Sequence, residues 1–583
     1  MSVITVENLR YRYPHAKELA LDGLDFSVEK GEFIGIIGEN GAGKSTLSQA
    51  LMGLVPQFYK GAYGGTVMVD GIEAGRTPVA QLCGHVGLVF QNPFNQLSGA
   101  KDNVYEEVAF GMQNLGVPAE EMKNRVEEAL KLLDIWQYRD RNPFDLSGGQ
   151  MQRVAIASVL VMRPDVMILD EPTSQLDPEG SDEVFKAVET LTGSGITILM
   201  IEQKIEKLAA YCDRILLLHK GKQIAFDTPQ KVFSMSDLNN YGIQAPAFTR
   251  ICKAEGVTLA DGTYPVTVEE AAGVLREKRL GAPACAEGGK CAQKAAGADV
   301  AGTDSAQAGG PAESAGSSDE QFCIENLDFS YLADVPVLKN LNMKLDKRPT
   351  AIIGQNGAGK TTLVKLLKGL LKPVSGSIYF HGEDISGKTV AMLAGNVGYV
   401  FQNPDDQIFK YNVMDEILFG PLNIGMDAER AKKEAERALK LTGLTGKEKE
   451  NPYDLELYER KMTAIASVLA MDTDVLILDE PTIAQDWKGR QIIGGIIRSL
   501  SERGKLVIAI LHDMDFVAEN FERVIIMAHG QVLADGTAKE VFAQEEALKK
   551  ARLQKPYVMQ LCEALGYEKS YLTVEELLKD QVS

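Results

Sequence analysis

The sequence predicts an α/β fold that is built twice in one chain, with a largely parallel sheet in each half. Short apolar runs typical of strands alternate with amphipathic stretches typical of helices, which is the pattern of α/β domains with parallel strands. Three segments also recur in the same order and at nearly constant offset: 38–45, 89–93 and 169–173 return at 354–361, 400–404 and 478–482. Internal repetition on this scale indicates two copies of one domain.

The repeat divides the chain into five segments. We expect two domains with small C-terminal extensions, separated by a flexible Ala/Gly-rich linker, at 1–245, 246–280, 281–320, 321–550 and 551–583. The extensions are included because Thr-Val-Glu-Glu at 267–270 returns at 573–576. The linker is too poor in apolar residues to offset its ordering entropy.

The expected elements of the first domain follow from its apolar runs. Those runs predict strands at Phe33–Ile37, Val166–Leu169, Ile196–Ile201 and Ile215–Leu218. Charged stretches with apolar residues at helical spacing predict a helical insertion at 117–140 and at 427–448.

Composition excludes some classes of protein. The 583 residues hold 61 Lys and Arg against 81 Asp and Glu, a net charge of −20, which argues against a protein that tracks nucleic-acid phosphates. With 45% apolar residues, the chain can bury a substantial core. We expect no signal peptide and no membrane span, because the longest apolar runs have the length of strands.

The seven cysteines form neither a disulfide framework nor paired knuckles, which favours a reducing cytosol. Cys285 and Cys291 lie close together in the expected linker without a nearby His, so we do not expect them to bind metal.

Each half contains a glycine loop of the Walker A type directly after an apolar strand. Such a loop turns successive backbone N–H groups toward phosphate oxygens, and the following helix adds its positive N-terminus. The lysine reaches the β- and γ-phosphates and the hydroxyl after it binds Mg²⁺. These residues are Gly38, Gly43, Lys44 and Ser45 in the first half and Gly354, Gly359, Lys360 and Thr361 in the second.

Two carboxylates end a buried strand in each half. Asp170 and Asp479 suit a Mg²⁺-water ligand. Glu171 and Glu480 suit a general base that polarises the attacking water.

The segment Leu146-Ser147-Gly148-Gly149-Gln150 gives the sequence its strongest resemblance. Together with the loops and strands above, it resembles the ABC (ATP-binding cassette) ATPases in both halves, whose signature is LSGGQ. The resemblance implies two tandem ABC-type P-loop nucleotide-binding domains, each with a helical subdomain. It also implies that the signature of one domain contacts ATP held by the other.

Further roles are implied by the same resemblance. Tyr13 and Tyr331 match the aromatic residue that stacks on adenine, Gln91 and Gln402 the glutamine that senses Mg²⁺, and Asp177 and Asp486 the D-loop aspartate. His512 matches the switch histidine. With ATP and Mg²⁺ as cofactors, nucleotide contacts are implied at Gly38, Asn40, Gly41, Gly43, Lys44, Ser45, Thr46, Gln91, Ser147, Gly148, Gly149, Gln150, Gly354, Asn356, Gly357, Gly359, Lys360, Thr361, Thr362 and Gln402. The metal positions are Ser45, Gln91, Asp170, Thr361, Gln402 and Asp479.

The two halves depart from each other at two positions that fall on one site. The second half has Leu455-Glu456-Leu457-Tyr458-Glu459 in place of the signature, and the first half has Gln203 in place of His512. In a head-to-tail pair, both departures belong to the site of Lys44 and Glu171. We therefore expect Glu480 and His512 to serve a hydrolysing site, and Glu171 and Gln203 a site that mainly binds nucleotide.

The segments 90–96 and 401–407 resemble those of energy-coupling factor (ECF) transporter ATPases, the cobalt- and vitamin-uptake type. This resemblance implies a motor subunit of an importer, peripheral on the cytoplasmic face of the cell membrane. Its partners would be a transmembrane scaffold (T-type) protein and a substrate-capture membrane subunit, with no nucleic acid. Two alternatives stay open: a soluble duplicated ATPase that acts on ribosomes or DNA, and a nonenzymatic nucleotide-gated regulator.

Overall fold

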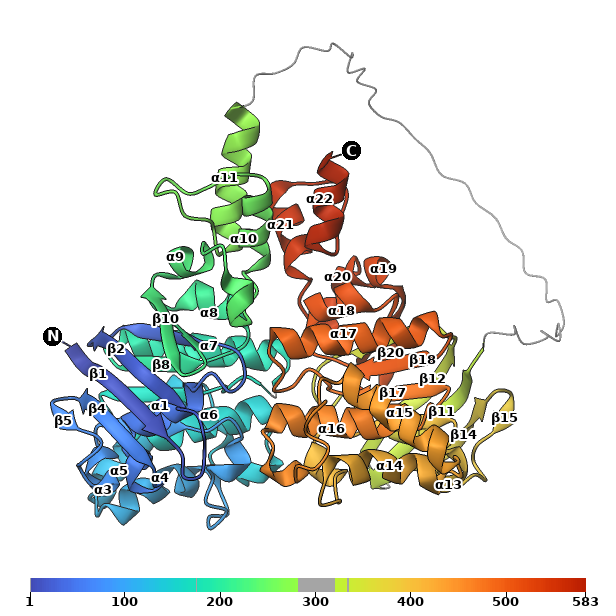
Figure 1. Ribbon diagram of the computed structural model, residues 1–583, viewed down its shortest axis with the longest axis horizontal. Coiled ribbons are helices and arrows are strands. Elements are labelled where there is room, and N and C mark those ends of the chain that lie inside the picture. Colours follow the sequence, from blue (N-terminus) through green and yellow to red (C-terminus); the bar gives the residue numbers. More distant parts are fainter. Residues whose placement is uncertain (1, 175, 282–319, 333–334, 583) are drawn as a thin grey trace.

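The computed structural model describes residues 2–174, 176–281, 320–332 and 335–582. The expected linker, with Cys285 and Cys291, lies almost wholly outside these residues. The described chain folds into two similar halves that lie side by side, with the two C-terminal extensions next to each other above them (Figure 1).

Each half is built on a six-stranded sheet that is parallel except for one edge strand. In the first half the order is β10 (Lys222–Asp227), β9 (Arg214–His219), β3 (Phe33–Ile37), β8 (Thr197–Ile201), β7 (Val166–Asp170) and β6 (Val86–Val89). In the second half it is β20 (Gln531–Thr537), β19 (Arg523–Ala528), β13 (Thr350–Ile353), β18 (Leu506–Ile510), β17 (Val475–Asp479) and β16 (Val397–Val400). The predicted parallel α/β fold is confirmed, and all four predicted strands are present.

A four-stranded antiparallel sheet packs against each parallel sheet. It consists of β2 (Leu21–Glu29), β1 (Ser2–Arg12), β4 (Ala62–Val69) and β5 (Ile72–Glu73) in the first half, and of β12 (Val335–Leu345), β11 (Phe322–Leu332), β14 (Ser375–Phe380) and β15 (Glu383–Asp384) in the second. In the first half, this sheet lies on the face of Ile34 and Ile36, and helices cover the opposite face with Phe33 and Ile37, so the parallel sheet is buried on both faces.

Helices connect the strands and form the predicted helical insertion. The main helices of the first half are α1 (Lys44–Leu51), α4 (Val104–Asn114), α5 (Ala119–Leu132), α6 (Gly148–Leu160), α7 (Pro178–Gly193) and α8 (Ile205–Tyr211). Those of the second are α12 (Lys360–Leu367), α14 (Val413–Asn423), α15 (Ala428–Leu441), α16 (Leu457–Leu469), α17 (Trp487–Glu502) and α18 (Met514–Asn520). Short helices are α2 (Leu54–Gln57), α3 (Val79–Leu82), α9 (Pro229–Phe233), α13 (Val390–Leu393), α19 (Ala538–Phe542) and α20 (Glu545–Lys550).

The two extensions share one apolar core. The helices α10 (Ala247–Ala254) and α11 (Val268–Gly281) of the first half pack against α21 (Tyr557–Leu565) and α22 (Val574–Val582) of the second. The repeated Thr-Val-Glu-Glu has a structural role here, because the hydroxyls of Thr267 and Thr573 cap α11 and α22 by accepting from the N–H groups of Glu270 and Glu576.

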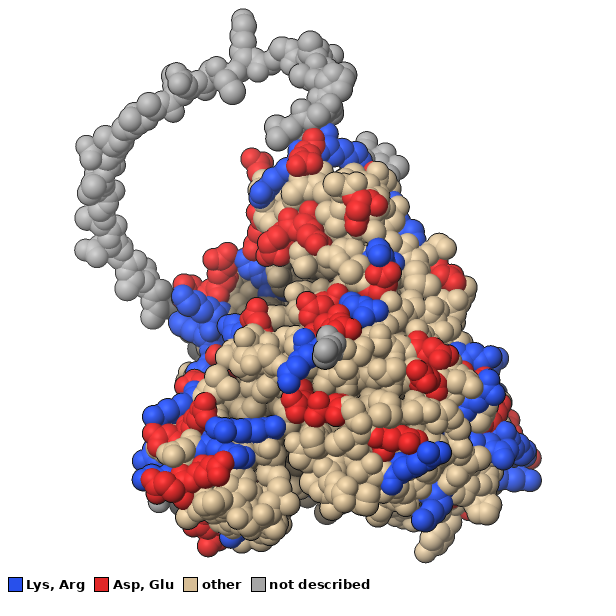
Figure 2. All heavy atoms as spheres, turned by 90° about the vertical axis from the view of Figure 1, so that its left-hand side faces the viewer, with Lys and Arg blue, Asp and Glu red and all other residues tan. Residues whose placement is uncertain are grey.

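Charges of both signs are interspersed on the face formed by the first half, and no basic stripe crosses the part of it that is in view (Figure 2). Among the described residues, none of the helices combines the length and the apolar character that a membrane span needs.

We expect Leu561→Ala, in the shared core of the extensions, to lower the free energy of unfolding by about 2–5 kcal/mol, because the fully buried side chain leaves a cavity. Thermal or denaturant unfolding measures the change. Leu115→Ala is the control, since Leu115 is 56% exposed and should cost less than about 0.5 kcal/mol. Equal losses in the two variants would contradict the shared core.

Candidate active sites

The two glycine loops lie at the boundary between the halves. The N–H of Asn356 donates to Asp177 Oδ2 at 3.0 Å, and the N–H of Asn40 donates to Asp486 Oδ2 at 2.9 Å. A second bond, from Asn40 Nδ2 to the carbonyl of Ala484, measures 2.9 Å. Each loop is thus completed by the other half, which is the predicted head-to-tail arrangement.

The glycines of the loops are required by close backbone contacts. Gly43 has a φ of 99° and Gly359 a φ of 97°, in the left-handed region just before the helix. A Cβ on Gly43 would stand 2.5 Å from the carbonyl oxygen of Ala20. Helices α1 and α12 therefore begin at the lysine, with their first N–H groups at the loop.

The lysines point back over their own loops. Lys44 Nζ donates to the carbonyls of Gly38 and Glu39 at 2.9 and 3.0 Å. Lys360 Nζ does the same with Gly354 and Gln355 at 2.8 and 2.9 Å. Both lysines are buried, and these bonds hold each ammonium at its own glycine loop, the type of loop that binds phosphate.

The oxygen ligands in the second half suit Mg²⁺. The Thr361 hydroxyl donates to Asp479 Oδ1 at 3.4 Å, and Tyr399 donates to the other oxygen of Asp479 at 2.8 Å. Hydroxyl and carboxylate oxygens are the ligands that this hard cation prefers. In the first half, burial raises the pKa of Asp170, and Ser45 acts in the opposite direction.

The two predicted general bases share an uncommon backbone conformation. Glu171 and Glu480 have φ values of 45° and 48°, and both side chains are buried. Positive φ in a non-glycine residue costs free energy and is concentrated at functional sites. The sequence gives no signal for this strain.

Each glutamate is held by two side chains from other segments. Gln91 donates to Glu171 Oε2 at 2.8 Å, and Gln203 donates to Oε1 at 2.7 Å. In the second half, Gln402 lies 2.9 Å from Glu480 Oε2 and His512 Nε2 lies 3.1 Å from Oε1. In both halves, the predicted glutamine and the residue at the switch position therefore contact the carboxylate of the predicted general base.

The pKa values of the two glutamates are shifted in opposite directions. Burial raises the pKa of Glu171 to about 7, although Lys44 acts in the opposite direction. Burial also acts upward on Glu480, but the attraction of His512 and Lys360 outweighs it and the pKa of Glu480 is lowered. Glu480 is therefore the better prepared of the two to be ionised at neutral pH.

The intact signature faces the second glycine loop. Helix α6 begins at Gly148, and the Ser147 hydroxyl caps it by accepting from the N–H of Gln150 at 3.4 Å. Gly148 lines a cavity of about 500 Å³ together with Lys360, Gln402, Glu480 and Tyr331. The signature of the first half and the predicted site residues of the second half thus line the same cavity.

The altered segment faces the first glycine loop. Glu456 stands at the start of α16, and its Oε1 lies 4.0 Å from where a Cβ on Gly41 would be. Burial raises the pKa of Glu456, and Lys44 acts in the opposite direction. A carboxylate therefore approaches the loop where the other site has Ser147 and glycine.

The two predicted adenine-stacking tyrosines sit differently. Tyr13 is half-buried, and its hydroxyl lies 3.2 Å from Thr46 Oγ1 and donates to Gln49 at 2.9 Å. Tyr331 is 58% exposed, with its hydroxyl 3.3 Å from Thr362 Oγ1.

Sequence reasoning missed a buried lysine in the second half. Lys461, on α16, donates to the carbonyls of Phe401, Gln402 and Asp479 at 2.9, 2.7 and 3.2 Å. It therefore fastens the segment of Gln402 to the end of β17. In the first half Gln152 occupies the matching position. A lysine on the apolar face of a predicted helix was the signal that could have revealed it.

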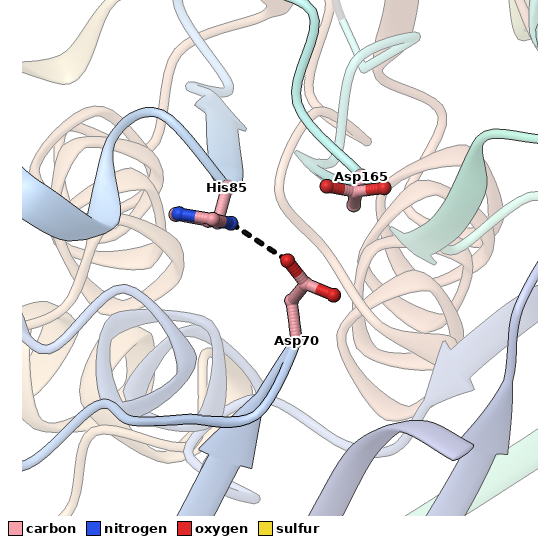
Figure 3. Close-up of side chains that lie close together, drawn as sticks. All are labelled: Asp70, His85 and Asp165. Carbon is pink, nitrogen blue, oxygen red and sulfur yellow. Dashed lines mark hydrogen bonds and ion pairs between the residues drawn. The ribbon is translucent and has the colours of Figure 1, made fainter. Parts of the chain in front are cut away.

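A further group of side chains that could bind a metal lies at the end of the first parallel sheet opposite to the glycine loop, where β6 and β7 begin. Asp70, His85 and Asp165 have ligand atoms within 4.8 Å of one another, and His85 Nδ1 is 2.7 Å from Asp70 (Figure 3). Lys30 already pairs with Asp165 at 2.8 Å. His85 and Asp165 precede β6 and β7, whereas the glycine loop follows β3, so this cluster is separate from the active sites.

Comparison with known proteins identifies both halves. The family model described as ABC transporter matches residues 21–174 and 338–483. A protein of Caldanaerobacter subterraneus subsp. tengcongensis, assigned as an ABC transporter ATP-binding protein, is 38% identical over 583 residues, covering 99% of this chain and 98% of that protein. A relative of the same description from Methanosarcina acetivorans is 36% identical, covering 99% of this chain and 92% of its own length.

Two solved structures are similar. CbiO1 from Clostridium perfringens, part of the ABC transporter complex cbiONQ, is 36% identical, covering 42% of this chain and 99% of its own, with a TM-score of 0.36. The archaeal ribosome recycling factor aABCE1, in complex with the ribosomal stalk protein aP1, has a TM-score of 0.56 at 20% identity, covering 91% of this chain and 90% of its own. The second likeness is one of fold alone.

The unequal glutamates predict opposite effects of one substitution on stability. Because the folded pKa of Glu171 is raised to about 7, its buried charge costs stability progressively as pH rises from about 4.5 to 7. We expect Glu171→Gln to stabilise the nucleotide-free protein by about 1–3 kcal/mol at pH 8, and to have little effect at pH 5.

Glu480→Gln is the matched control. Since the pKa of Glu480 is lowered, its carboxylate contributes stability above its unfolded pKa, and the variant should be destabilised at pH 8. Thermal unfolding at the two pH values checks both signs. A shift of the same sign in both variants would contradict this electrostatic difference.

Proposed function

The chain belongs to the ABC transporter family, as an ATPase with two ATP-binding domains in tandem, and we propose that it is the motor subunit of an ECF-type importer. Its cargo would be a vitamin or a transition-metal ion, bound by a separate membrane subunit. The domain division predicted at residues 245, 280, 320 and 550, and the predicted roles of the site residues, are part of this proposal.

We propose further that the two sites divide the work. The observation that carries this is the placement of the signature segments: Gly148 shares a cavity with Lys360 and Glu480, whereas Glu456 approaches the loop of Lys44. The replacement of the switch histidine by Gln203 falls on the same site as Glu456. Loss of one preorganised donor typically costs about 3–4 kcal/mol in the transition state. The second site would hydrolyse ATP, and the first would mainly bind it.

The residues of the second site fit in-line attack of water on the γ-phosphate. Thr361 and Asp479 would hold Mg²⁺, which neutralises charge on the phosphates. Glu480 would accept a proton from the attacking water, a step worth about 10²- to 10⁴-fold. Gln402 and His512 hold the two oxygens of this carboxylate, and Lys360 together with the α6 N-terminus would face the phosphates.

Exposed aromatic side chains next to both glutamine segments support docking to a membrane protein. Phe94 is 54% exposed and stacks on Phe144 near Gln91, and Tyr411, in the segment after Gln402, is 86% exposed. Clustered apolar side chains in water mark interaction surfaces. With the resemblance of 90–96 and 401–407 to ECF ATPases, this supports a transmembrane scaffold as the partner and a peripheral position on the cytoplasmic face.

The division of work predicts unequal effects on steady-state ATP turnover. We expect Glu480→Gln to lower turnover by about 10²-fold or more, since the general base of the complete site is lost. Glu171→Gln should keep most of the activity. Turnover that survives Glu480→Gln and is abolished by Glu171→Gln would reverse the assignment.

The transport role predicts stable association with membrane proteins. The tagged full chain, extracted from membranes in mild detergent, should co-purify with a multi-span scaffold protein. Tyr411→Asp should release the scaffold but leave nucleotide binding intact, because Tyr411 does not line the cavity of Lys360 and Glu480. Co-sedimentation with ribosomes or DNA at moderate salt, without such a scaffold, would favour the soluble alternative.

A further inference from the structure

A buried carboxylate fixes the segment that carries Gln203 in the first half. Glu202 is 3% exposed, and its Oε1 accepts from both the N–H and the hydroxyl of Thr173 at 3.0 and 2.6 Å. Its Oε2 accepts from the N–H of Gln203 at 3.0 Å. Hydrogen bonds to an ionised group are the stronger kind. Glu202 therefore joins the segment after Glu171 to the switch position of the same site.

The next residue but one extends this connection toward the other half. Lys204 Nζ donates to the carbonyl of Thr173 at 3.1 Å and to the hydroxyl of Ser181 at 2.5 Å. Ser181 in turn donates to the carbonyl of Asp177 at 3.0 Å.

Asp177 is the residue that accepts from the N–H of Asn356, in the glycine loop of the second site. An unbroken series of hydrogen bonds thus runs from the switch position of the first site to the phosphate loop of the second.

The second half does not repeat this arrangement. The residues that match Glu202, Lys204 and Ser181 are Leu511, Asp513 and Arg490. Leu511 is fully buried and cannot bridge two segments by hydrogen bonds. Asp513 caps α18 by accepting from the N–H of Phe516 at 2.9 Å, and pairs with Arg490. The switch segment of the second half is therefore held by its own helix and by α17.

We propose that Glu202 and Lys204, with their hydrogen bonds to Thr173 and Ser181, form a connection that we call the tie. The tie holds Gln203 on Glu171 and couples occupancy of the first nucleotide site to the geometry of the second. This inference rests on the proposed division of work between the sites. Glu202 and Lys204 are positioning residues, because Glu202 acts through Gln203 and Lys204 acts through Asp177. Lys204 also lines a cavity of about 190 Å³ between the halves, which it shares with Asp513, Glu171 and Glu480. A displacement of Gln203 on nucleotide binding is passed along the tie to the N–H of Asn356.

A double-mutant cycle on the full chain tests the tie. Lys44→Met weakens nucleotide binding at the first site, and we expect it to lower ATP turnover at the second. In a Lys204→Met background this effect should shrink by about 5-fold or more, the lower end of usual coupling between sites. A merely structural role for Lys204 would change turnover but leave the effect of Lys44→Met unchanged.

Three variants serve as controls. Lys207→Met removes a lysine that lines the same cavity and pairs with Asp182, and it should keep the full effect of Lys44→Met. Lys204→Arg should restore the coupling. If Lys204→Met does not fold, Ser181→Ala breaks the same series at its far end and enters the same cycle.

Two results would overturn the proposal: an additive cycle in folded variants, or no effect of Lys44→Met on turnover. The Glu480→Gln variant separates this failure from that of the proposed function. If Glu480→Gln abolishes turnover but the cycle is additive, only the tie is wrong. If turnover survives Glu480→Gln, the division of work itself is wrong.

Discussion

The arrangement of the whole molecule depends on two hydrogen bonds from backbone N–H groups to aspartates of the opposite half. Asn40 donates to Asp486 and Asn356 donates to Asp177, so neither glycine loop is complete within its own domain. The extensions strengthen the same pairing through their shared apolar core, and Arg552 pairs with Glu179 across the boundary at 2.6 Å. Because each site takes parts from both halves, a change in one domain alters the site of the other.

The two sites differ through few neighbours of an almost identical backbone. Glu171 and Glu480 have the same strained φ and the same glutamine partner, but one is next to Gln203 and the other next to His512. Burial raises the pKa of Glu171 to about 7 although Lys44 and Gln203 act in the opposite direction, whereas His512 and Lys360 outweigh burial and lower the pKa of Glu480. Lys461 and Tyr399 add fixed contacts around Asp479 in the second half alone, since Gln152 and Leu88 stand in the first. The fixed contacts around Asp479 and the lowered pKa of Glu480 therefore both occur in the second site.

Local patterns predicted the fold and most of the candidate site residues. The glycine loops, the apolar strand runs and the signature each encode a local conformation, and all of them occur where expected. Lys461, Glu202 and Lys204 were not predicted, because their importance lies in contacts with residues far away in sequence. Periodicity shows that a helix face is buried, but it does not show which polar groups the side chains on that face will contact. The packing of the two extensions was hidden for the same reason.

The boundary between the halves also explains why unequal domains pair with each other. Lys204 and Asp513 occupy equivalent positions and attract each other across a shared cavity, where burial lowers the pKa of Lys204 to about 8. Glu206 and Arg490 attract each other in the same space. Two copies of the first half would lack this attraction because Lys204 would face another Lys204, and two copies of the second would lack it because Asp513 would face another Asp513. These attractions therefore favour the mixed pair, the pairing in which Gly148 of the intact signature and Glu480 line one cavity.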